Sequence, residues 1–143
     1  MEHRIDTRLV DWLSQNAIHF LRIGLGVVFL WFGALKFAPG LSPAEGLVRK
    51  TVSCMVDPTW FLPVLATWEC VIGINLLINR FLPATLISLF FHMAGTFLPV
   101  ITCPEEVWAS FPHALTLEGQ YIVKNLVIIG AAAALVGSLH RRR

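Results

Sequence analysis

Four long apolar stretches alternate with short polar segments along the chain. They run over residues 17–38, 60–79, 81–102 and 120–139. Each is close to the roughly 20 residues that an α-helix needs to cross the hydrocarbon core of a bilayer. Strands are excluded as spans, because open sheet edges would leave backbone groups without partners in lipid. The pattern therefore predicts an all-α, integral membrane four-helix bundle that forms one domain over residues 1–143.

The segments between the spans carry local signals for turns and helix ends. Asn79-Arg80 alone separates the second and third spans, which predicts a tight turn and an antiparallel hairpin. Ser42-Pro43-Ala44-Glu45 has the pattern of a capping box with proline at the first helical position. It predicts a short helix in the first outer loop, and we expect that helix to lie at the membrane interface. Asp57-Pro58 predicts the N-cap and first residue of the second span.

Composition and charge agree with a protein that is almost entirely membrane-embedded. Hydrophobic residues make up 56% of the chain and charged residues 14%, whereas a soluble domain carries roughly 25% charged residues. The net charge of +2 is too small to favour nucleic acid as a partner. Arginines lie at both termini and in the 79–80 turn, whereas the loop at residues 103–119 has no Lys or Arg. By the positive-inside rule, both termini are expected to be cytoplasmic.

Glu69 is the most informative polar residue, because it lies near the middle of the second span. A glutamate side chain is too short to reach water from there. It must be protonated, paired with a cation, or exposed to a water-filled cavity. A structural ion pair and a ligand or proton site both remain open as interpretations.

Three further ionisable side chains lie in the first and third spans. Arg22 and Lys36 are 14 residues apart, close to four helical turns, and so share one face. Snorkelling to the nearest interface would explain each of them alone, but a shared face that includes Gly26 and Gly33 favours an internal network. His92 lies mid-span on a polar stripe, either as a neutral, hydrogen-bonded side chain or as a proton relay. No metal site is expected, because no second His or Cys lies one turn away.

The start of the fourth span adds four polar candidates. They are Glu118, Tyr121, Lys124 and Asn125. Together with the residues above, they predict a polar pocket that opens on the outer side. Its cations outnumber its acids by one, which would suit a bound anion or a quinone head group. Further along this span, the small residues Gly130, Ala134 and Gly137 indicate either tight helix packing or the seam of a homo-oligomer.

The cysteines offer one candidate disulfide. Cys54 and Cys103 both fall on the outer side, where a bond could form if that compartment is oxidising. Cys70 is mid-span and is expected to be an inert buried residue. The sequence has no C-x-x-C pair, haem-ligand pair, flavin motif or nucleotide loop, so no intrinsic cofactor is expected.

From about residue 17 onward, the chain resembles the DoxX-like superfamily of small four-helix bacterial membrane proteins. Within it, the YkgB-like family, related to a reactive-chlorine resistance protein, is the most similar. The resemblance is carried by Arg22-Ile-Gly-Leu-Gly through Phe32-Gly33-Ala-Leu-Lys36-Phe37, by His92-Met-Ala-Gly-Thr-Phe-Leu-Pro99, and by Ala114-Leu-Thr-Leu-Glu118-Gly-Gln-Tyr121-Ile-Val-Lys124-Asn125-Leu. It implies a bacterial inner-membrane location and either a subunit of a quinone-linked oxidoreductase or a role in oxidant resistance.

Three functions are compatible with these features. The first is a membrane subunit or stress protein that binds a quinone, or a small oxidised species, beside a redox partner subunit. The second is a purely structural subunit in which the buried charges only hold the bundle together. The third is a small proton-coupled transporter that uses Glu69. Whether the chain is an enzyme stays open, since it would at most be a subunit without a cofactor of its own.

Overall fold

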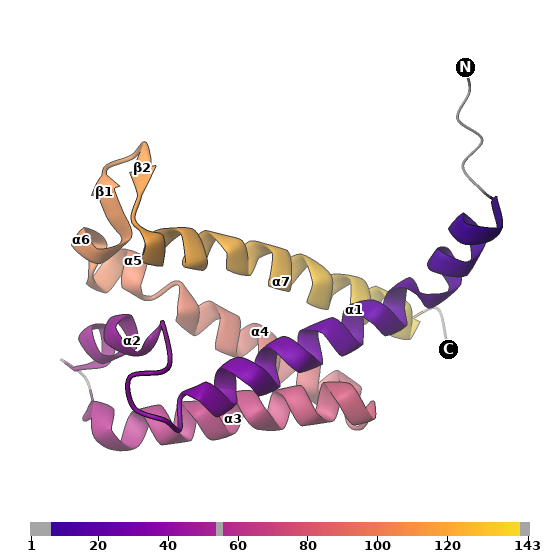
Figure 1. The fold of residues 1–143 in the computed structure, drawn as a ribbon, viewed down its shortest axis with the longest axis horizontal. Helices are drawn as coiled ribbons and strands as arrows, with labels where there is room; N and C mark the ends of the chain where they lie inside the picture. The colour runs from indigo at the N-terminus through magenta and orange to yellow at the C-terminus, as the bar shows by residue number, and fades with distance from the viewer. Residues whose placement is uncertain (1–6, 54–55, 141–143) are drawn as a thin grey trace.

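The computed structural model describes residues 7–53 and 56–140, and these form a helical bundle with one short β-hairpin (Figure 1). Within those ranges, four helical segments are long and apolar enough to cross a membrane. They are α1 (Thr7–Leu35), α3 (Pro58–Ile78), α4 (Leu82–Thr96) with its continuation α5 (Pro99–Thr102), and α7 (Leu117–His140). The shorter elements are α2 (Glu45–Val52), α6 (Pro104–Val107), and the antiparallel strands β1 (Trp108–Ser110) and β2 (Ala114–Leu115). The predicted all-α membrane bundle is confirmed.

The connecting segments gather at two opposite ends of the bundle. The start of α1, the end of α7 and the α3–α4 turn lie at one end, called the terminal end below (Figure 1). The other end, called the loop end, carries α2, α5, α6 and the hairpin. The α3–α4 turn is tight because Asn79 and Phe81 both adopt left-handed conformations, with φ of 57° and 50°. The predicted antiparallel hairpin of the second and third spans is therefore present.

The first helix differs from the predicted span at both ends. It already includes Thr7, because the polar residues before residue 17 are compatible with a helix although they are too polar for lipid. At 29 residues it is about 43 Å long, more than the roughly 30 Å hydrocarbon core. It ends at Leu35 rather than at residue 38, ahead of Pro39 and of Gly40 with its positive φ of 79°. Lys36 therefore lies in the turn after the helix.

The third and fourth spans also differ from the predicted boundaries. The third is interrupted between Thr96 and Pro99, because proline has no N–H for the helical ladder. Around the break, Phe97 and Leu98 donate to carbonyls only three residues back. The fourth span begins at Leu117, three residues early, and the hydroxyl of Thr116 accepts the N–H of Gly119 as an N-cap does.

The short helix of the first loop is present, but the predicted capping box is wrong. Ala44 occupies the N-cap position and contributes no side-chain hydrogen bond. The carboxylate of Glu45 instead accepts the backbone N–H of Gly40 at 2.7 Å. That hydrogen bond, followed by the one from Arg49, lowers the pKa of Glu45. The acid therefore closes the preceding turn, because the chain reverses direction at Gly40 and brings its N–H to the carboxylate.

The core is centred on the contact between α1 and α3. Gly73 lies so close to α1 that an added Cβ would be 2.5 Å from the backbone nitrogen of Leu30. Gly26 and Gly33 meet α3 with similar closeness. These small residues let the two backbones approach, as in many packed membrane helices. The apolar cluster around this contact draws on four spans and contains Leu25, Phe29, Ile72, Leu76, Leu86, Leu89, Met93, Ala132 and Leu135.

The predicted cap of the second span is confirmed, and it makes a testable contribution to stability. Asp57 Oδ1 accepts the backbone N–H of Thr59 at 2.9 Å, and this bond is the main cause that lowers the pKa of Asp57. Because the pKa is lower in the folded protein, the ionised Asp57 stabilises the fold at pH values above its ordinary pKa of 3.8. This contribution is lost as the pH falls through the pKa of the folded state. We expect Asp57→Ala to lower the melting temperature in detergent at about pH 6, and the deficit to shrink on acidification.

Asn is the matched control at this position, because its side-chain oxygen can cap without a charge. Asp57→Asn should retain most of the stability at about pH 6 and should remove the pH dependence of stability that Asp57 causes. An Asp57→Ala protein that melts at the wild-type temperature at every pH would contradict the cap.

Candidate functional site

A buried carboxylate in the middle of the bundle holds two partners from other segments. Glu69 Oε2 lies 2.5 Å from Lys36 Nζ, and Glu69 Oε1 lies 3.1 Å from His92 Nε2. The three side chains are only 5–9% exposed. They come from the turn after α1, from α3 and from α4. We call them the Lys36–Glu69–His92 network.

The close approach of α1 to α3 positions the network. Glu69 is the twelfth residue of α3, about 16 Å along the axis from Pro58, well within the membrane-spanning length. Gly33 faces it, and a Cβ on Gly33 would lie 2.9 Å from Glu69 Cβ. Because α1 ends at Leu35, Lys36 lies in the turn directly after the helix. From there its Nζ reaches the carboxylate of Glu69.

Aromatic side chains enclose the histidine. The ring of His92 packs edge-on against Phe29 and Trp68, with centroid distances of 5.6 and 5.4 Å. Trp68 Nε1 in turn donates to Ser88 Oγ at 2.6 Å, which fixes the indole. Trp68 was not among the predicted site residues. The available signal was a tryptophan in mid-span, since tryptophans of membrane proteins concentrate at the two interfaces.

The charges of the network balance if the histidine is neutral. Lys36 supplies one positive charge and Glu69 one negative charge, and a neutral His92 with its proton on Nε2 donates to the carboxylate. Burying either ion alone would be costly, whereas in the network Lys36 and His92 together give both carboxylate oxygens of Glu69 a partner. Protonation of His92 or Glu69 would change the net charge by one unit. The arrangement can therefore hold or pass a proton at membrane depth.

Arg22 does not join this network. Its Nη1 donates to the carbonyl of Leu77 at 3.0 Å and also to the carbonyl of Leu76. Both carbonyls are in the last turn of α3, where the helix leaves its acceptors without intrahelical partners and the dipole favours a cation. Arg22 is therefore bound inside the protein as a cap of α3 instead of extending to the interface.

The four candidates of the last span lie apart from the network. Asn125 Nδ2 donates to Thr96 Oγ1 at 3.0 Å, beside the break in α4. Lys124 is exposed and its Nζ lies 5.2 Å from the centroid of the exposed Tyr121 ring. Glu118 is half-buried in the first turn of α7. The structure thus joins three of the eight predicted site residues, because α7 turns Ile122 inward and Lys124 outward.

The cysteines and the small residues of α7 lie outside the network as well. Cys103 is buried at the start of α6, while Cys54 is outside the described residues, so the disulfide stays a prediction. Cys70 is next to Glu69 and faces the carbonyl of Leu30 at 3.9 Å. Gly130 and Gly137 have open space where a Cβ would stand, so neither is used for close packing within this chain.

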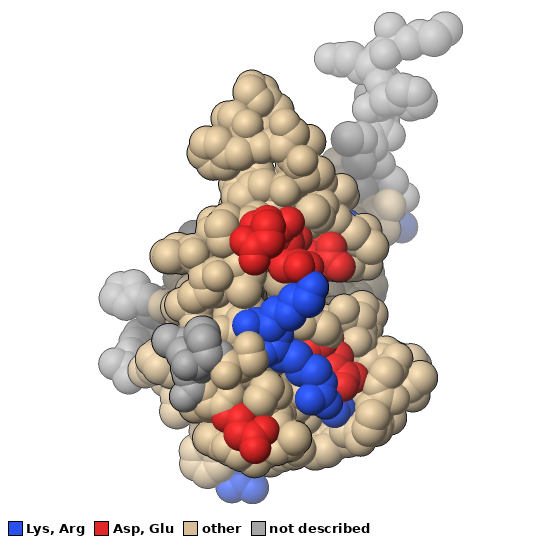
Figure 2. Space-filling model, turned by 90° about the vertical axis from the view of Figure 1, so that its left-hand side faces the viewer, with Lys and Arg blue, Asp and Glu red and all other residues tan. Residues whose placement is uncertain are grey.

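The loop end carries paired charges. Lys50 Nζ of α2 binds Glu106 Oε1 of α6 at 2.6 Å, and Arg49 binds Glu45 within α2 at 2.9 Å. The hydrogen bond that Lys50 donates to Glu106 raises the pKa of Lys50, and the charges of Glu106 and Glu118 add to this effect. Figure 2 shows basic side chains crossing the middle of this face with acidic ones around them. The Lys50–Glu106 pair ties α2 to α6.

Comparison with known protein families identifies one match. The family model described as DoxX matches residues 17–102, which include the Lys36–Glu69–His92 network and end before α7. No curated protein and no solved structure matches the chain.

Proposed function

This chain belongs to the DoxX family, and we propose that it is the membrane subunit of a quinone-linked redox system. The Lys36–Glu69–His92 network would be the place where a quinone head group exchanges protons. One observation carries the proposal: a carboxylate at membrane depth is shared between an ammonium and an imidazole. Ionisable groups at that depth are costly, and in membrane proteins they commonly belong to ligand sites and proton relays.

The chemistry of these side chains fits a quinone. Reduction of a quinone to a quinol consumes two electrons and two protons, one for each oxygen. Lys36 and His92 are N–H donors for such oxygens, and Glu69 can return a proton to either of them. Phe29 and Trp68 offer aromatic surfaces for a planar ring. The electrons would come from a redox centre on a partner subunit.

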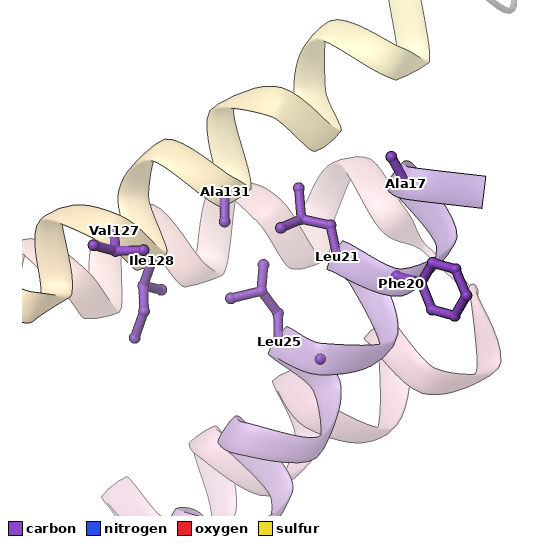
Figure 3. A pocket seen from close by; sticks show the side chains of 8 residues that line it. Ala17, Phe20, Leu21, Leu25, Val127, Ile128 and Ala131 are labelled. Atoms are coloured by element: carbon purple, nitrogen blue, oxygen red, sulfur yellow. The ribbon is translucent and has the colours of Figure 1, made fainter. Parts of the chain in front are cut away.

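An apolar groove between α1 and α7 supports the same proposal. It has a volume of about 450 Å³, and its lining is apolar. Leu21 and Leu25 of α1 face Ile128 and Ala131 of α7 across it (Figure 3). Leu25 is one helical turn from Phe29, whose ring contacts His92. A hydrophobic quinone tail lying in this groove would have its head near the network.

A structural role is the second candidate, and one feature favours it. Both oxygens of Glu69 already have partners, and these partners join the end of α1 to α3 and α4. A network that only locks three helices together would look the same. The two candidates differ in whether a small molecule competes for the partners of Glu69.

We further propose that the protein lies in a bacterial inner membrane with both termini in the cytoplasm. Arg8 and Arg80 lie at the terminal end, and in the sequence Arg4 and the three C-terminal arginines flank that end, whereas the loop end carries Arg49 and Lys50. The terminal end therefore has more Lys and Arg than the loop end, as the positive-inside rule expects of the cytoplasmic side. A role in oxidant resistance, as in YkgB-like proteins, would fit a quinone-linked subunit.

Association with a second copy through α7 is a further part of the proposal. Gly130 and Gly137 lie at helical spacing with Ala134, and all three are exposed. Since the glycines have open space around them, they could admit a close helix from another subunit.

The experiment is to identify small molecules that copurify with the protein in mild detergent, by mass spectrometry, for wild type and Glu69→Gln. We expect a quinone in wild type and its loss in a folded Glu69→Gln protein. Lys124→Gln is the matched control, because Lys124 is exposed and outside the network; it should keep the quinone. If the wild-type protein binds no quinone even after incubation with excess quinone, the quinone proposal is wrong and the structural role remains.

A further inference from the structure

A second groove lies at the loop end, away from the network. It has a volume of about 420 Å³ and is formed by α5, α6 and β1 with the residue that follows β1. Its lining consists of Val100, Pro104, Glu105, Trp108, Ala109, Ser110 and Phe111. Neither the quinone proposal nor the structural alternative makes use of it.

Two aromatic rings form one wall of this groove. Trp108 and Phe111 pack edge to face with ring centroids 5.2 Å apart, so each restrains the other. Phe111 is nevertheless 75% exposed, and Ile101, next to the groove residue Val100, is 81% exposed. Such exposure of apolar side chains at the end of a spanning helix is typical of contact with lipid. The groove therefore borders the bilayer surface.

The groove also carries a carboxylate with no basic neighbour in sequence. Glu105 is exposed, whereas the adjacent Glu106 is engaged with Lys50. Residues 103–119 contain three glutamates and neither Lys nor Arg. Among the described residues, Glu105 takes part in no ion pair. An organic cation is the ligand that complements an acid beside aromatic faces.

We infer that this groove binds the protonated amine of an aminophospholipid head group. The ammonium would donate to Glu105 and Ser110 and lie against the aromatic wall, with the acyl chains along the exposed surface near Ile101. An anionic head group is disfavoured by the unpaired charge of Glu105 in the groove. A choline head group has no N–H and would forgo the hydrogen bonds. The groove thus discriminates between lipids by charge and by donor capacity.

Native mass spectrometry of delipidated protein tests the inference. The probe is an equimolar mixture of phosphatidylethanolamine, phosphatidylcholine and phosphatidylglycerol with matched acyl chains. We expect the wild type to retain phosphatidylethanolamine at least about fivefold over phosphatidylglycerol. Glu105→Gln should bring that preference close to one, and Trp108→Leu should reduce it.

Matched controls separate the groove from general lipid contact. Glu118→Gln removes an acid of the same segment that does not line the groove, and Trp60→Leu removes an exposed aromatic residue of α3. Both should keep the wild-type preference. If Trp108→Leu does not fold, Glu105→Gln, which changes an exposed residue, still tests whether the groove binds the amine. Equal retention of the three lipids by wild type, or a preference unchanged in Glu105→Gln, would overturn the inference.

Discussion

Replacing Glu69 with leucine should lower the free energy of unfolding by about 3–5 kcal/mol. The substitution leaves the ammonium of Lys36 without its counter-charge and the Nε2 of His92 without its acceptor. Both groups are almost fully buried, so water cannot replace the lost partner at low cost. The measurement is reversible unfolding in mixed micelles, or the shift of the melting temperature where unfolding is irreversible.

Removing both ions should be much less harmful than removing one. In the double variant Lys36→Met, Glu69→Leu, no unpaired charge remains, and apolar replacements of a buried pair are often close to neutral. The double variant is therefore expected to recover most of the stability that Glu69→Leu loses. If the two variants are equally unstable, the pairing of Lys36 with Glu69 does not account for the cost.

Gly73→Ala should be a strongly damaging single-methyl change at the contact between α1 and α3. The new Cβ would lie 2.5 Å from the Leu30 nitrogen and 2.8 Å from the Gly26 oxygen, and both are backbone atoms that cannot rotate away. The helices α1 and α3 must then separate, at a cost of about 1–3 kcal/mol or more. Because the same contact brings Lys36 to Glu69, the variant should also weaken the network. Thermal unfolding in detergent measures the loss.

Gly24→Ala is the matched control on the partner helix. An added Cβ at Gly24 meets no atom within 4 Å, and alanine is favoured over glycine inside a helix by about 0.5–1 kcal/mol. The control should be unchanged or slightly more stable than wild type. A Gly73→Ala protein as stable as Gly24→Ala would show that α1 and α3 do not pack as described.

The sequence alone determined the class of protein and the number of spans. The hydropathy pattern of a span does not depend on tertiary contacts, because the bilayer itself requires about 20 apolar residues in a row. The local signals at Asp57 and Asn79 were confirmed, since a cap and a tight turn involve only neighbouring residues. The predicted capping box of the first loop was wrong, because Glu45 binds the N–H of Gly40 instead. The candidate status of Glu69 followed from the same logic, because a lone acid in an apolar span needs a partner wherever the other helices lie.

Only the tertiary structure decided which polar residues meet. Helical spacing placed Arg22 and Lys36 on one face, yet one binds the end of α3 and the other binds Glu69. The division arises because the two residues are about 21 Å apart along the axis of α1, and the antiparallel packing of α3 brings its last turn to Arg22 and its middle to Lys36. Likewise, the rotation of α7 about its axis directs Lys124 outward. Such rotations are set by complementary surfaces of two helices, and the sequence of one helix does not contain that information.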